Sequence, residues 1–256
     1  MKRLLLLLLL PLFCAWPSIN LGGGTPVQAG GSCGTGTPTL RASSQAKVQQ
    51  NNASPYYYVD VTSGTITAGD LIVLTCSIND YYENMVAITP SDNRGNTYTA
   101  VTTQFFNDPG NYTLGQGIFL AVAGATQTVT ARCHSGTNTG YLYLLATVSA
   151  FSGTDGKTLA TYTNGSGTTE TTRPGGNLVT GDACTSLYLS VATANSNNTH
   201  TGPAGWTMNA AVCQNGTWQT GCLGYYIGTG TQAQTWTGDS PVGSWFVNGA
   251  VVEAAP

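Results

Sequence analysis

The chain has 256 residues, of which 7% are charged, and its formal net charge is −3. Its few basic residues cannot neutralise many phosphates, so nucleic acid is not an expected partner. Apolar residues make up 41% of the chain, which argues against disorder, and the abundance of Gly, Thr, Ser, Asn and Tyr favours an extracellular all-β protein with a neutral surface.

The N-terminus has the features of an export signal. Lys2 and Arg3 precede an apolar stretch from Leu4 to Trp16, and Val27-Gln28-Ala29 supplies small residues for cleavage. We therefore predict a signal peptide over 1–29 and a secreted or cell-surface protein. The apolar stretch is shorter than the roughly 20 residues needed to span a membrane, so no transmembrane segment is expected in the mature chain. Residues 30–46 are small and polar and are expected to form a flexible N-terminal segment.

The residues after this segment follow strand patterns. Residues 71–78 are almost continuously apolar or Thr, which predicts a central strand. Residues 127–133 alternate with period two, which places Thr128, Thr130 and Arg132 on one face. Further strands are predicted over 56–61, 97–101 and 141–151, with a turn of Asp, Asn and Gly over 92–96.

The strand pattern occurs twice. Gly69-Asp70 opens one strand and Gly181-Asp182 opens another. Similar segments then follow each of them in the same order: 95–99, 117–121 and 140–146 in the first half, and 205–209, 224–228 and 243–250 in the second. Residues 152–180 separate the halves and should hold a strand near Lys157 to Tyr162.

This repeat predicts one domain over 47–256. Its fold would be a single large antiparallel β-sandwich, jelly-roll-like, made of two related halves at about 47–151 and 181–254. Two independent small domains are the alternative, disfavoured because four strands alone bury little surface.

Six cysteines remain once the signal peptide is removed, and an even number in an exported chain predicts disulfides. Cys76 and Cys133 lie in predicted strands of the first half and are expected to pair. Cys213 with Cys222, closing a broad loop, and Cys33 with Cys184 are the remaining pairs, although Cys213 and Cys222 can also each bond elsewhere.

Aromatic residues are the main indication of binding. Four of the five tryptophans fall in the second half, and aromatic rings on a neutral sandwich can stack on sugars. Trp218 and Trp236 lie among Gly, Thr and Gln and are expected to be exposed, whereas Trp245 and Tyr143 are expected in the core. The candidate ligand-binding residues are Trp206, Trp218, Trp236 and Tyr225.

A structural calcium site is a second candidate. Asp92, Asn93 and Asn96 gather oxygen ligands in one turn, which calcium favours. The competing interpretation is that Asp and Asn only form the turn, and it is favoured because no EF-hand spacing is present. No other cofactor is expected.

Evidence for an enzyme is weak. His134 and His200 lie in segments that are typical of exposed loops. A pair of Gln219 and Glu253 on the sandwich face is the one catalytic arrangement considered, and only the residue types support it. No catalytic residue is predicted.

The chain resembles a loosely defined class of bacterial secreted β-sandwich modules. The matching segments are Val48-Gln49, 69–73, 92–99, 119–124, 126–130 and 141–153, and the resemblance covers about 47–254. Such modules are similar to jelly-roll carbohydrate-binding and adhesion domains, and no catalytic residues carry over. The segment 148–153 lacks the acidic residue that is usual there.

The expected function is that of a secreted, non-enzymatic surface, adhesion or carbohydrate-binding module whose partners are glycans or cell-surface polymers. The first alternative is a self-assembling subunit of an extracellular filament or coat, in which residues 30–58 pair with a neighbouring sheet edge. The second is a β-sandwich hydrolase.

Overall fold

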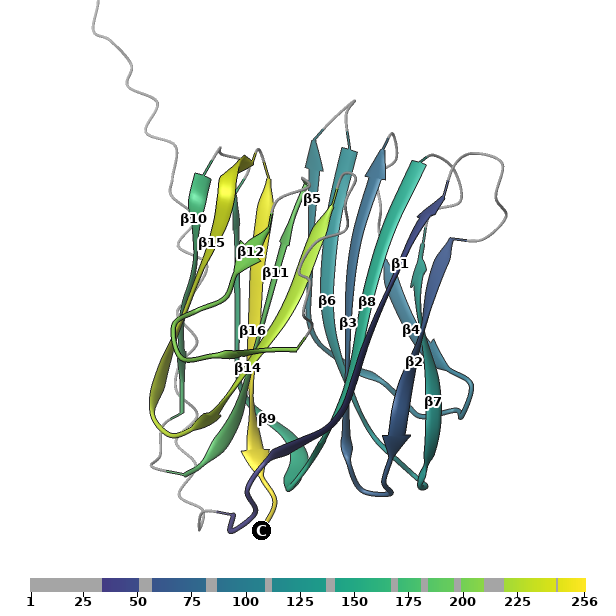
Figure 1. Ribbon diagram of the computed structural model, residues 1–256, viewed down its shortest axis with the longest axis vertical. Helices are drawn as coiled ribbons and strands as arrows, with labels where there is room; N and C mark the ends of the chain where they lie inside the picture. The colour runs from purple at the N-terminus through teal and green to yellow at the C-terminus, as the bar shows by residue number, and fades with distance from the viewer. Residues whose placement is uncertain are drawn as a thin grey trace, which may run out of the picture.

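The structure is a computed structural model. It describes residues 34–50, 57–81, 87–108, 112–136, 141–166, 170–180, 184–195, 199–209, 219–242 and 244–256. These residues form strands and turns, and the paired strands run antiparallel, which confirms the predicted all-β class (Figure 1). Within the described ranges there is no helix of the length and hydrophobicity needed to cross a membrane. The predicted signal peptide, Cys33, Cys213 and Trp218 lie outside them.

The first half contains eight strands in two sheets. A five-stranded sheet has the order β1-β8-β3-β6-β5 and a three-stranded sheet has the order β2-β7-β4. The strands are β1 Thr39–Gln50, β2 Tyr58–Ile66, β3 Leu71–Tyr81, β4 Ile88–Asp92, β5 Thr99–Asp108, β6 Tyr112–Val122, β7 Gln127–Ser135 and β8 Tyr141–Ser152.

The second half repeats this arrangement strand for strand. Its sheets have the orders β13-β14-β11-β16-β9 and β10-β15-β12, so each strand occupies the place of the strand eight positions earlier. The strands are β9 Thr154–Ser166, β10 Glu170–Val179, β11 Ser186–Ala194, β12 His200–Thr201, β13 Thr207–Met208, β14 Thr220–Gly228, β15 Thr231–Val242 and β16 Trp245–Ala254. Eight strands in two such sheets are typical of a jelly roll.

This repetition explains the two related halves seen in the sequence. The segments 117–121 and 224–228 fall on β6 and β14, and the parts 141–146 and 245–250 of the other two segments fall on β8 and β16. The first strand-opening pair, Gly69-Asp70, precedes β3. Its counterpart, Gly181-Asp182, lies outside the described residues.

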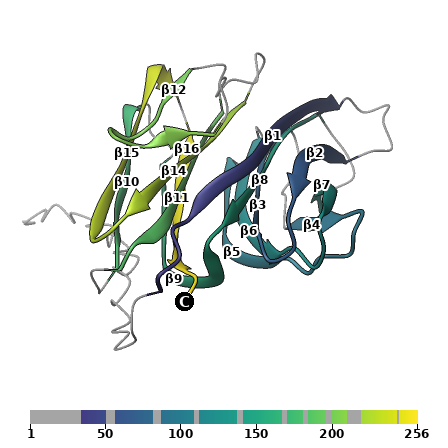
Figure 2. The ribbon, with the colours of Figure 1, turned by 60° about the horizontal axis from the view of Figure 1, so that its bottom comes forward.

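The four sheets stack as layers, with the five-stranded sheets in the middle (Figures 1 and 2). One apolar cluster fills the space between the sheets of the first half, and others lie between those of the second. A further cluster, which includes Val73 on β3 and Leu189 on β11, joins the two five-stranded sheets. The structure therefore has more layers than a single two-sheet sandwich, because each half has eight strands and its own core.

Burial on both faces accounts for the continuous apolar run of β3. This strand lies in the centre of its sheet, between β8 and β6. Ile72 and Leu74 point into the core of the first half, while Leu71 and Val73 point toward the second half. Both faces of the strand therefore select apolar residues, and the predicted central position is confirmed.

Two segments are more ordered than the sequence suggests. β1 begins at Thr39, inside the segment 30–46 that is expected from its composition to be flexible. The segment 152–180 holds two strands, β9 and β10, where the sequence predicts one near Lys157 to Tyr162. Because β9 pairs with β16 and β10 pairs with β15, the second half begins at Thr154.

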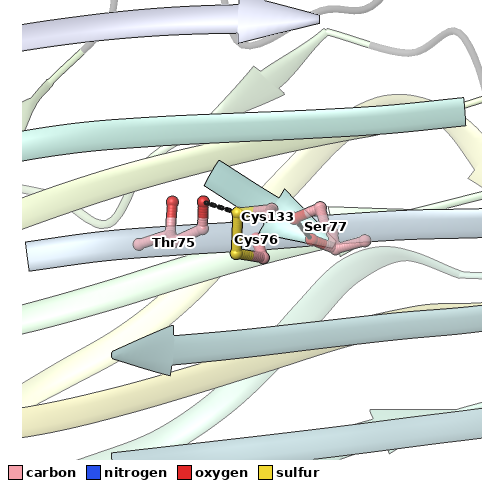
Figure 3. The surroundings of a disulfide bond; sticks show 5 residues. Thr75, Cys76, Ser77 and Cys133 are labelled. Carbon is pink, nitrogen blue, oxygen red and sulfur yellow. Dashed lines mark hydrogen bonds between the residues drawn. A yellow bond between two sulfur atoms is a disulfide. The ribbon is translucent and has the colours of Figure 1, made fainter. Parts of the chain in front are cut away.

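A disulfide joins the two sheets of the first half. Cys76 on β3 bonds to Cys133 on β7, with a Cα–Cα distance of 5.8 Å, as predicted (Figure 3). Both side chains are buried in the first-half core. Cys184 and Cys222 are also in disulfides. The predicted pairs Cys33–Cys184 and Cys213–Cys222 each include one cysteine outside the described residues and stay predictions.

Candidate functional site

A groove of about 690 Å³ lies where the two halves meet. Its floor is the face of the first five-stranded sheet that looks toward the second half, at Leu71, Val101 and Leu120. Its side is the beginning of β9, at Gly156 and Thr158. The groove therefore needs both halves, because β9 belongs to the second.

The polar side chains of the groove are neutral. Thr97, Thr99 and Thr158 line it. None of their hydroxyl groups forms a hydrogen bond to another described residue, so all three are available to a ligand. Val122, which is 52% exposed, adds an apolar surface beside them. The groove thus combines free hydroxyl groups with exposed aliphatic carbon.

Gly156 keeps this groove open. It has a φ of +77°, which favours glycine, and a Cβ at this position would lie 3.1 Å from Cγ2 of Val122. Leu40 on β1 and Tyr225 and Ile227 on β14 also pack on the apolar cluster between the halves.

The predicted calcium residues form the turn beside the groove. Asp92 Oδ1 accepts hydrogen bonds from the backbone N–H groups of Arg94 (2.8 Å) and Asn96 (3.1 Å). Asp92 Oδ2 accepts from Asn96 Nδ2 (2.8 Å) and from the Tyr98 hydroxyl (3.0 Å). Burial, followed by the charge of Asp92, raises the pKa of Tyr98, so its phenol stays a donor. Asp92 therefore holds the turn together.

The other two residues of this set also accept hydrogen bonds. Asn93 Oδ1 accepts from the backbone N–H of Thr130 (2.9 Å), and Asn96 Oδ1 accepts from that of Gly124 (3.5 Å). Asn96 also lines the groove. These contacts match the turn-forming interpretation, since the oxygen atoms proposed as metal ligands already have donors. The described residues contain no group of three or more His, Cys, Asp or Glu placed to hold a metal.

A second, smaller hollow of about 260 Å³ lies on the other side of the same turn. Asp92 and Asn93 line it together with Asp60 and Arg132. Arg132 donates to both carboxylate oxygens of Asp60, at 2.7 and 2.8 Å, and its guanidinium lies 3.5 Å from the ring centre of Tyr58. Asp60 and Arg132 match each other's charge, and the carboxylate of Asp92 already accepts four hydrogen bonds, so this hollow offers a ligand less than the groove does.

Among the predicted aromatic residues that the structure describes, Trp206, Tyr225 and Trp236 do not form one surface. Trp236 is fully buried, so its expected exposure is wrong. Its indole N–H donates to Ser190 Oγ at 2.9 Å inside the second-half core. Tyr225 packs edge-on against Phe151 of the first half, with ring centres 5.2 Å apart. Trp206 is half-buried and lies 6.1 Å from the ring of Tyr226. The predicted core positions of Trp245 and Tyr143 are confirmed.

The histidines occupy strands. His134 is half-buried on β7, and His200 on β12 is 4% exposed, so the expectation of exposed loops is wrong. His200 Nε2 lies 2.9 Å from Thr220 Oγ1. Burial, and then the positive charge of Arg173, lowers the pKa of His200 well below 6.5.

Comparison with known proteins adds no relative: family models, curated proteins and solved structures all give no match to this chain. The groove is not visible in the sequence because Thr97, Thr99 and Thr158 resemble the many other threonines of the chain. The one visible signal is Asn96, in the turn next to it.

Proposed function

We propose that this protein is a secreted, non-enzymatic surface or adhesion module that binds a neutral polysaccharide in the groove between its halves. The observation that carries the proposal is the groove itself, with three free hydroxyl groups and an aliphatic floor but no charged side chain among its described lining residues. The expected disulfides suit an exported protein.

The groove chemistry suits a sugar chain. Hydroxyl groups both donate and accept, so Thr97, Thr99 and Thr158 can exchange hydrogen bonds with sugar hydroxyls. The aliphatic carbon of Leu120 and Val122 can cover the C–H faces of a sugar ring. A volume of about 690 Å³ falls within the common range of ligand pockets, roughly 300–1,000 Å³.

The hydrolase alternative receives less support from the geometry. Glu253 lies opposite Ser186 at one end of β11, while Thr220, the neighbour of Gln219, lies opposite Ala194 at the other end. Glu253 also forms an ion pair with Lys157 at 2.8 Å. The two proposed catalytic side chains are therefore far apart and cannot act on one bond.

Filling the groove tests the proposal. We expect Thr158→Tyr to abolish retention of the mature protein on neutral polysaccharides, measured by affinity electrophoresis through gels that contain one polysaccharide at a time. The matched control is Thr161→Tyr, at an exposed position on the same strand that does not line the groove. Equal melting temperatures of the two variants would show that both fold.

Two outcomes would overturn the proposal. One is that the unmodified protein is retained on no neutral polysaccharide. The other is that Thr158→Tyr and Thr161→Tyr are retained equally, which would place binding elsewhere on the molecule.

A further inference from the structure

The interface between the halves changes character along its length. The apolar cluster between the two five-stranded sheets occupies the end at which β3 begins, near Leu71. Farther along the same strands the contacts are polar. Ser77 and Thr193 are hydrogen bonded at 2.5 Å, and Asn79 Nδ2 donates to Asn195 Oδ1 at 2.8 Å. These two regions are the apolar end and the polar end of the interface.

The apolar end is also where the chain joins the halves. β8 ends at Ser152 and β9 begins at Thr154. The backbone N–H of Ala255 donates to the carbonyl oxygen of Gly153 at 2.9 Å, and the backbone N–H of Gly36 donates to that of Ala255 at 2.8 Å. The covalent joint, the C-terminal residues and the segment that leads into β1 therefore meet at this end, which is the lower end in Figure 1.

Strands β6 and β16 face each other across the interface. The two hydrogen bonds between β3 and β11 show that these strands run in the same direction, so their antiparallel neighbours β6 and β16 do too. Both pairings run without a register shift. Tyr112 on β6 is hydrogen bonded to Ser244, just before β16, at 2.6 Å. Gln116 and Asn248 each lie four residues beyond this contact, and therefore opposite each other.

These two facing amides are buried but incompletely bonded. Both residues are 0% exposed. Gln116 Nε2 donates to the carbonyl oxygen of Val191 (3.3 Å) and to Thr193 Oγ1 (2.6 Å), so its Oε1 points elsewhere and has no donor among the described residues. The side-chain oxygen and nitrogen of Asn248 have no partner among them either, nor does Oε1 of Gln104, which lies opposite Gln116 on β5. Buried polar atoms without hydrogen bonds destabilise the closed interface.

We propose that the halves open at the polar end of their interface and pivot on the apolar end. When the polar end opens, water replaces the hydrogen bonds of Ser77, Thr193 and Gln116, and it also bonds the side-chain atoms that have no partner in the closed form. Opening the apolar end would instead expose the aliphatic cluster to water, which is unfavourable. The polar end therefore has the lower free energy of opening, as expected of a part that moves.

The test is the rate at which iodoacetamide labels a cysteine introduced at either end of the interface of the mature protein. No reductant is added, so that the native disulfides stay closed, and the label is counted by mass spectrometry. We expect Asn248→Cys to be labelled at least about tenfold faster than Ala250→Cys, because local opening has a lower free energy than global unfolding. Ala250 is the matched control, since it is equally buried two residues along the same strand but belongs to the apolar cluster.

A second pair repeats the measurement on the other half. Gln116→Cys should be labelled faster than Ile118→Cys, which lies two residues along β6 in the apolar cluster. Melting curves check that each of the four variants folds.

Two outcomes would overturn the proposal. One is that the folded polar-end variants are labelled as slowly as the apolar-end variants, which would show that the interface stays closed along its whole length. The other is fast and equal labelling at both ends, which would show that the halves separate without a pivot. No polysaccharide is present in this experiment, so its outcome is independent of the groove.

Discussion

At the scale of single residues, His200 makes the stability of the second half depend on pH. Its pKa is well below 6.5 in the folded chain, because of burial and of Arg173, and returns to about 6.5 on unfolding. The unfolded state therefore binds the extra proton as the pH falls below 6.5. The full stabilisation is present above that pH and declines below it, by at most about 1.4 kcal/mol per pH unit.

We expect the free energy of unfolding, measured in denaturant from pH 7.5 to pH 5, to fall more steeply in the unmodified protein than in His200→Gln. Gln can keep a hydrogen bond to Thr220 but does not titrate. His134→Gln on β7 is the matched control and should keep the steep dependence. Identical pH profiles for the unmodified protein and His200→Gln would contradict this account.

At the scale of an element, the turn over 92–98 depends on one carboxylate. Asp92 accepts four hydrogen bonds, and losing them leaves several donors without partners. We expect Asp92→Ala to lower the free energy of unfolding by about 1–3 kcal/mol, measured in denaturant. Ser91→Ala, at an exposed neighbour, should have little effect.

The same variants separate the two interpretations of the turn. If Asp92 acts only through hydrogen bonds, the melting temperature of the unmodified protein should be equal in calcium and in a chelator. A rise in calcium that Asp92→Ala abolishes would instead show that the turn binds the ion.

At the scale of the whole molecule, the two halves are joined by an interface with reciprocal contacts. β6 contacts β16 while its equivalent β14 contacts β8, and β3 contacts β14 while β11 contacts β6. Ser77 and Thr193, on the equivalent strands β3 and β11, are hydrogen bonded at 2.5 Å. Such reciprocity is typical of two-fold interfaces between identical subunits.

Close approach of the halves depends on Gly221. A Cβ there would lie 2.5 Å from Leu145 Cδ2 and 2.9 Å from Ser77 Oγ, both in the first half. We expect Gly221→Leu to force the halves apart, so that calorimetry shows two transitions where the unmodified protein shows one. Ile227→Leu, a conservative change on the same strand, is the control. A single unshifted transition for Gly221→Leu would contradict this interpretation.

The sequence predicts the strands better than their layering. Leu71 to Ile78 and the alternation over 127–133 are long periodic signals, and both are strands. β12 and β13, of two residues each, are too short to show a period. Trp236 and His200 are misplaced by sequence reasoning because their neighbours are small and polar. Because side chains alternate along a strand, Thr235 and Thr237 point outward while Trp236 points into the core. The polar composition of the segment therefore does not reveal that Trp236 is buried.

The reciprocal interface also bears on how the chain arose. Two halves with the same strand order that meet through equivalent strands have the arrangement expected of a two-fold homodimer joined into one chain. The joint is short, since β8 ends at Ser152 and β9 begins at Thr154, so each half always has its partner at a high effective concentration. A fused pair is also free to diverge, as two identical subunits are not. The groove beside Gly156 is lined by residues of both halves, so it exists only in the joined pair.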